Sequence, residues 1–117
     1  MAVSLEFLVD MLKLELKEVE HDLVNLEKLY INRHDSSEIT HYVFFENRAV
    51  LKAELDSIHR IGVLLENFVI DEYSTPEHIL TELEAYIAQI VRERQFSDAV
   101  HNFTKAKINK VRKYLDM

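Results

Sequence analysis

Residues 4–33 read SLEFLVDMLKLELKEVEHDLVNLEKLYINR, and apolar side chains recur in this stretch at spacings of three and four. They are Leu5, Leu8, Leu12, Leu16, Val19, Leu23, Leu26 and Tyr30. Because about 3.6 residues make one helical turn, these positions form a continuous seam along one side of an α-helix. A four-residue stutter separates Leu12 from Leu16, so we expect this helix to pack lengthwise against a partner with little supercoiling.

Two more helices follow in the predicted fold. A second helix is expected over residues 37–72, capped by a polar residue of the preceding loop. A third is expected over residues 75–115, because Thr75 and Pro76 place a hydroxyl at the cap and a proline in the first turn. A proline at this position is harmless, since the first amides of a helix have no partner within the helix.

The apolar pattern of the third segment changes face in its middle. Either one helix shifts its buried side, or the chain turns at residues 95–97 and Ser97 caps a fourth helix. The absence of glycine and proline there favours one helix. We therefore predict an all-α, antiparallel up-down-up bundle of three long helices in a single domain over residues 1–117. Four helices, with a break near residues 95–97, are the alternative.

The composition excludes several classes of protein. One glycine and one proline among 117 residues leave few residues suited to tight turns, which excludes folds rich in β-hairpins. The chain has no cysteine, which excludes disulfides, thiolate metal ligands and cysteine nucleophiles. No apolar run approaches the roughly 18 residues of a membrane span. The N-terminal segment has acidic residues where a signal peptide would have basic ones. We expect a cytoplasmic protein with no membrane partner.

Charge is distributed unevenly along the chain. Residues 1–91 hold 18 acidic and 7 basic side chains, a net charge of −11, whereas residues 92–117 hold 3 acidic and 7 basic, a net charge of +4. The basic residues lie in the last turns of the third predicted helix, where the helix dipole favours cations. An up-down-up bundle places them beside Glu27, Asp35 and Glu38. We expect no nucleic-acid partner, because the acidic remainder repels phosphate.

Four histidines follow a carboxylate by three residues, the spacing of the Glu-x-x-His motifs of di-iron bundles. The pairs are Glu18 with His21, Glu38 with His41, Asp56 with His59, and Asp98 with His101. On a helical wheel His21 lies opposite the apolar seam, and His41 adjoins the first loop, so neither is expected at a bundle axis. We therefore expect solvated ion pairs, no metal ligands and no cofactor.

Two enzymatic alternatives rest on histidines. His59 lies in mid-helix three residues before Gly62, and this placement is similar to the phosphoryl-accepting histidine of histidine phosphotransfer domains. The glycine comes one position earlier than in that family, and the lysine usual there is absent. Arg94 and His101 have the Arg-x6-His spacing seen in HEPN-type ribonucleases, which are helical domains that act on RNA as dimers. Both are alternatives to a chain that is not an enzyme.

The second predicted helix carries more apolar surface than a bundle core needs. Residues 42–45, 63–65 and 68–70 are apolar runs, and three consecutive residues cover about 200° of a helix, whereas a core-facing stripe is about 100° wide. This excess predicts a non-enzymatic interaction module that forms a homodimer or binds a helical protein. The residues expected between copies are Phe44, Phe45, Leu64 and Phe68.

Overall fold

The computed structural model describes residues 4–71 and 74–115. The described residues form α-helices and one short 3-10 helix, and they contain no strand. The elements are α1 (Leu5–Asp35), α2 (His41–Leu64), η1 (Leu65–Asn67), α3 (Pro76–Glu93) and α4 (Asp98–Leu115). The all-α prediction is confirmed. The prediction of three long helices is wrong, and the four-helix alternative fits the structure.

The helix starts follow side-chain caps. The hydroxyl of Ser4 accepts a hydrogen bond of 3.1 Å from the amide three residues on, and the hydroxyl of Thr75 does the same at 3.2 Å. Each cap satisfies an amide that the first helical turn leaves unpaired. Helix α2 starts later than predicted, because Thr40 caps it in the same way. It also ends earlier, since the chain leaves η1 in extended backbone at Phe68.

The turn between α3 and α4 explains why three helices were predicted. Gln95 adopts the left-handed conformation, with φ of 56°, and ends α3 at a position where glycine is usual. The amide of Phe96 donates to the carbonyl of Val91 at 2.9 Å, which completes a Schellman motif. The amide of Val100 then donates to Ser97 Oγ at 3.3 Å. A glutamine in this role carries no turn signal in the sequence.

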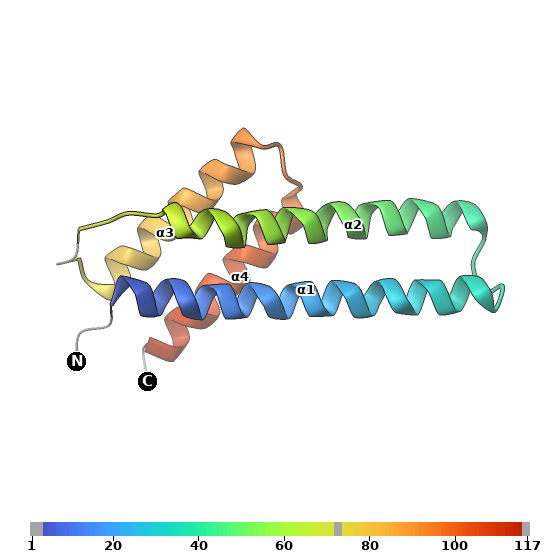
Figure 1. The fold of residues 1–117 in the computed structure, drawn as a ribbon, viewed down its shortest axis with the longest axis horizontal. Coiled ribbons are helices and arrows are strands. Elements are labelled where there is room, and N and C mark those ends of the chain that lie inside the picture. The colour runs from blue at the N-terminus through green and yellow to red at the C-terminus, as the bar shows by residue number, and fades with distance from the viewer. Residues whose placement is uncertain (1–3, 72–73, 116–117) are drawn as a thin grey trace.

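Helices α1 and α2 form a long antiparallel hairpin, and α3 and α4 form a shorter one that lies across one of its faces (Figure 1). The molecule measures 56 × 31 × 18 Å, and the long hairpin runs along its longest axis. The shorter hairpin covers only part of this length. We call residues 5–23 and 51–64 the proximal half, and residues 24–35 and 41–50 the distal half, which ends at the α1–α2 loop.

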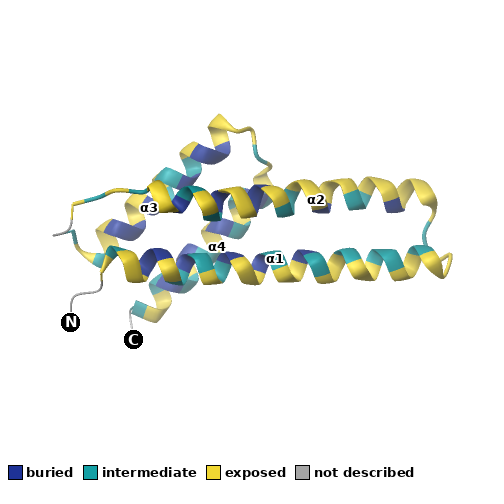
Figure 2. Ribbon diagram, in the orientation of Figure 1, coloured by how far each residue is buried: buried dark blue, intermediate teal, exposed yellow. Residues whose placement is uncertain are grey.

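The hydrophobic core lies where the two hairpins overlap. Its buried residues come from all four α-helices, and in α1 they end at Leu23. In α2 the core begins at Leu51, and of the distal residues only Phe44 is buried (Figure 2). None of the described helices is long and apolar enough to cross a membrane.

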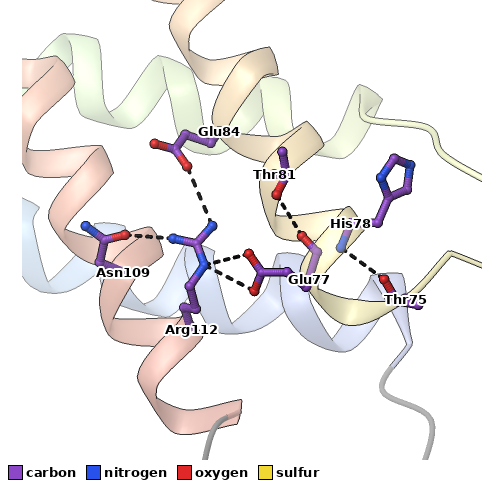
Figure 3. A network of polar contacts seen from close by, with 7 residues as sticks. All are labelled: Thr75, Glu77, His78, Thr81, Glu84, Asn109 and Arg112. Atoms are coloured by element: carbon purple, nitrogen blue, oxygen red, sulfur yellow. Dashed lines mark hydrogen bonds and ion pairs between the residues drawn. The ribbon is translucent and has the colours of Figure 1, made fainter.

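Ion pairs join α4 to α1 of the long hairpin and to α3 of its own hairpin. Lys110 Nζ lies 2.9 Å from Glu15 Oε2, and Lys107 Nζ lies 3.2 Å from the same oxygen. Near the end of α4, Arg112 Nε donates to Glu77 of α3 at 3.0 Å (Figure 3). The basic segment therefore lies on the proximal half. Its expected position beside Glu27, Asp35 and Glu38 is wrong, because the turn before α4 reverses the chain.

Candidate interaction surface

The distal half exposes large apolar side chains. Leu26 follows Leu12 by 14 residues, two heptads, and so occupies the same side of α1. Leu12 is fully buried, whereas 38% of Leu26 is exposed, because α3 and α4 do not reach it. The large exposed apolar residues of the distal half are Leu26, Leu29, Tyr42, Val43, Phe45 and Val50.

In α1, Leu26 and Leu29 lie on the side of the helix that contacts α4 in the proximal half. Glu15 pairs with Lys107 and Lys110 of α4, and Glu18 is within ion-pair distance of the same lysines. Leu26 and Leu29 follow Glu15 and Glu18 by 11 residues, about three helical turns, so they continue that side of the helix beyond α4.

In α2, Val50 and Val43 continue the same face. Val50 lines a recess of about 280 Å³ together with Gln95, Phe96 and Ser97 of the α3–α4 turn, which places it on the side of the shorter hairpin. Val43 precedes Val50 by one heptad and shares that side. The apolar face that α3 and α4 leave uncovered, which we call the distal strip, consists of Leu26, Leu29, Val43 and Val50.

Four aromatic rings close the distal end of the hairpin. His34 stacks on Phe44, with ring centroids 4.2 Å apart and an angle of 9° between the planes. His41 meets His34 edge to face at 4.5 Å, and His34 Nε2 lies 2.5 Å from His41 Nδ1. Phe45 packs beside Phe44 at 5.3 Å. The cluster joins the last turn of α1 to the first turn of α2.

The four residues predicted between copies lie in different environments. Phe45 is 61% exposed at the distal end, whereas Phe44 is buried in its own chain under His34. Leu64 and Phe68 are partly buried against the core. The ring of Phe68 also packs beside that of Tyr86, with ring centroids 5.4 Å apart. Phe45 is thus the member of this set most available to a second copy, and contact between copies stays a prediction.

A groove runs between α1 and α2, and all of its lining residues come from these two helices. It has a volume of about 790 Å³ and is lined in part by Lys17, Lys28 and Lys52. His59 also lines it, with 69% of its side chain exposed, and its Nδ1 lies 3.1 Å from Glu20 Oε1. The carboxylates of Glu20 and Asp56 also line the groove, so it carries charges of both signs beside one oriented imidazole.

The other residues considered from the sequence do not form a site. Arg94 is exposed at the end of α3, and His101 is partly buried in the first turn of α4. Within residues 4–71 and 74–115, no hydrogen bond or ion pair joins these two side chains, and no group of three potential metal ligands occurs. The helical wheel of α1 predicted that His21 lies outside the core, and His21 is exposed in the structure.

Perturbed ionisable groups lie at helix contacts. Burial alone raises the pKa of Glu15, but hydrogen bonds from Lys110 and Lys107 and their positive charges outweigh it and lower this pKa. The hydrogen bond to Glu15 raises the pKa of Lys110. Burial raises the pKa of Glu54, which lines the recess beside Val50. These shifts follow from packing and pairing of helices.

Comparison with models of known families, with characterised proteins and with solved structures finds no significant match to this chain.

Proposed function

We propose that this chain is a non-enzymatic helical interaction module that self-associates through the distal strip. The observation that supports the proposal is the position of the exposed apolar residues. They continue the face that α3 and α4 cover on the proximal half, but no second layer of helices lies on them. The distal half of a second copy would supply that layer and complete a four-helix arrangement.

The expected affinity follows from the apolar area. Fully burying a valine or leucine is worth about 1.5–3 kcal/mol, so residues that are already half-buried gain about 1 kcal/mol each. Two copies of a four-residue strip therefore gain about 8 kcal/mol before the entropic cost of association is subtracted. We expect a weak, concentration-dependent homodimer. A different helical protein with a matching apolar stripe would be the alternative occupant of this strip.

Sedimentation equilibrium tests the proposal with two matched variants. Val50→Glu places a charge in the strip, and Val69→Glu places one at an exposed valine outside it. The wild type and Val69→Glu should dimerise at tens of micromolar, whereas Val50→Glu should stay monomeric with unchanged helical circular dichroism. A monomeric wild type, or equal dissociation of both variants, would contradict self-association through the strip.

A second candidate function is phosphoryl transfer through His59. With its proton on Nδ1, the ring donates to Glu20 and presents the lone pair of Nε2 as a nucleophile. Lys17 and Lys52 of the groove can hold phosphate oxygens. A Cβ built on Gly62, one turn away, would meet no atom within 4 Å, so a partner can approach closely.

Phosphoramidate tests this candidate without a partner protein. The phosphoryl group would pass from the nitrogen of phosphoramidate to Nε2 of His59, and ammonia would leave. Peptide mapping should show faster modification at His59 than at His21, which is exposed on the same groove, and Glu20→Gln should slow it. Equal rates at the two histidines would remove the support for a phosphotransfer role.

A further inference from the structure

We infer that two copies associate through the distal strip in opposite directions, and that Asp22 and Arg33 of α1 set this orientation. The inference rests on the proposed self-association and specifies its geometry. The two charged residues flank the leucines of the strip, so that acidic, apolar, apolar and basic side chains follow one another at spacings of four, three and four. These residues are Asp22, Leu26, Leu29 and Arg33.

All four residues lie on the same side of α1. Asp22 follows Glu15 by seven residues, and Glu15 marks the side that contacts α4. Arg33 follows Leu26 by seven residues, and one heptad returns to nearly the same side of a helix. Both charged side chains are exposed, and neither forms an ion pair in the part of the chain that the structure describes. Two opposite charges beside the strip can therefore pair with a second copy.

The spacing becomes self-complementary when one copy is reversed. The midpoint of Leu26 and Leu29 lies between residues 27 and 28, and the midpoint of Asp22 and Arg33 lies at the same point. When two α1 helices pack antiparallel about a two-fold axis at this point, Leu26 of each copy contacts Leu29 of the other. Asp22 of each copy then lies opposite Arg33 of the other. A parallel alignment of the two α1 helices would set like charges at the same height.

The valines of α2 fit the same axis. Glu27 Oε2 lies 3.5 Å from Arg48 Nε, so the point between residues 27 and 28 of α1 is about level with the point between residues 47 and 48 of α2. The midpoint of Val43 and Val50 lies between residues 46 and 47, only one residue or about 1.5 Å away. The axis that α1 defines therefore brings Val43 of each copy near Val50 of the other.

The position of the shorter hairpin requires the reversed orientation. It lies on the same face as the strip, so two copies that run in the same direction would bring both shorter hairpins into the same space (Figure 1). Reversed copies place these hairpins at opposite ends of the assembly. With the axis between residues 27 and 28, the end of α1 of the second copy at Asp35 is level with Glu20. This end lies two residues short of Glu18, which pairs with Lys107 of α4, so α4 is not displaced.

Charge reversal in the full chain tests the pairing by sedimentation equilibrium. Asp22→Arg and Arg33→Asp each place like charges at both ends of the α1 contact, so each should weaken the dimer by at least about tenfold. An equimolar mixture of these two variants should recover wild-type association, because the arginines of one variant then face the aspartates of the other. Lys28→Glu changes the net charge as much as Arg33→Asp, but it lies in the groove and should dimerise as the wild type does.

A distance between spin labels tests the orientation directly. The chain has no cysteine, so Glu38→Cys gives a single labelling site in the exposed α1–α2 loop. In the antiparallel dimer the two labels are separated by about 20 residues along α1, or roughly 30 Å. In a parallel dimer the two loops would be neighbours, and the labels would lie less than about 20 Å apart, since packed helix axes are about 8–10 Å apart. Pulsed electron paramagnetic resonance measures this distance.

The outcomes separate this orientation from the proposed function. A wild-type dimer with labels less than about 20 Å apart would overturn the antiparallel arrangement and leave self-association intact. The same holds if the mixture of Asp22→Arg and Arg33→Asp associates no more tightly than either variant alone. A chain that is monomeric at every concentration would contradict both. Circular dichroism of each variant checks that the helices are folded.

Discussion

The proximal and distal halves of the long hairpin are built from the same two helices, yet only one half has a core. Leu12 and Leu26 occupy equivalent heptad positions, and the first is fully buried while the second is 38% exposed. The difference comes from α3 and α4, which have 18 residues each, whereas α1 has 31. Heptad periodicity places a residue on the apolar side of a helix, but a second layer is needed to bury it.

The two halves also differ in the helices that their ion pairs connect. In the proximal half, the partly buried carboxylate of Glu15 pairs with both Lys107 and Lys110 of α4. In the distal half, Arg48 Nε lies 3.5 Å from Glu27 Oε2, and this contact joins only α1 to α2. The distal half therefore depends on the contact between two helices, and we expect it to be the less stable part of the monomer.

The largest difference between the two halves should appear when the two equivalent leucines are truncated. Leu12→Ala leaves a cavity in the core and should lower the free energy of unfolding by about 2–5 kcal/mol. Leu26→Ala should lower it by less than about 1 kcal/mol in the monomer, because solvent already reaches the side chain. Urea denaturation at low protein concentration measures both. Similar losses would show that the distal half is as well packed as the proximal half.

Hydrogen exchange should show the same contrast along the backbone. Amides of residues 26–33 and 43–50 should exchange at least about tenfold faster than those of residues 8–23 in dilute solution, since fewer tertiary contacts oppose local opening. Raising the protein concentration should protect the distal amides and leave the proximal ones unchanged, because association covers only the strip. Protection that is uniform at every concentration would contradict this division of the hairpin.

The Glu15 ion pair should make the proximal half sensitive to acid. The pKa of Glu15 is lower in the folded chain than its ordinary value of 4.5, so its carboxylate stabilises the fold above that pH. This stabilisation is lost as the pH falls through the folded pKa. Glu15→Gln should therefore cost about 1 kcal/mol at pH 7 and less at pH 3. Denaturation curves at both pH values test it, and Glu82→Gln, at an exposed position of α3, is the control.

The smallest effect concerns Glu54, at the boundary between the halves. Burial raises its pKa, so the charged carboxylate disfavours the folded state at neutral pH. Glu54→Gln should stabilise the chain by a few tenths of a kcal/mol at pH 7, and the difference should shrink as the pH falls and the wild-type carboxyl takes up its proton. A destabilised variant at pH 7 would show that the charge has a favourable partner.

The candidate surface was predicted only in part from the sequence. The excess of apolar residues in α2 pointed to association, and Phe45 is exposed as that prediction requires. The exposure of Leu26 was not predicted, because its position in the apolar seam of α1 predicted burial. The contact between His34 and His41 was also missed, since it depends on how the α1–α2 loop closes. Ser37 adopts φ of 63° there, a conformation that its residue type does not announce.

Local features of the chain determined the helices and most of their starts. The seam of α1, the Ser4 cap and the Thr75–Pro76 start signal act over one or a few turns, so they can be recognised in the sequence. Tertiary structure decided the rest. Gln95 takes a conformation suited to glycine because α4 gains a core by folding back, and the same reversal places α4 on the proximal half. The uncovered distal strip follows from that placement, since two helices of 18 residues cannot cover one of 31.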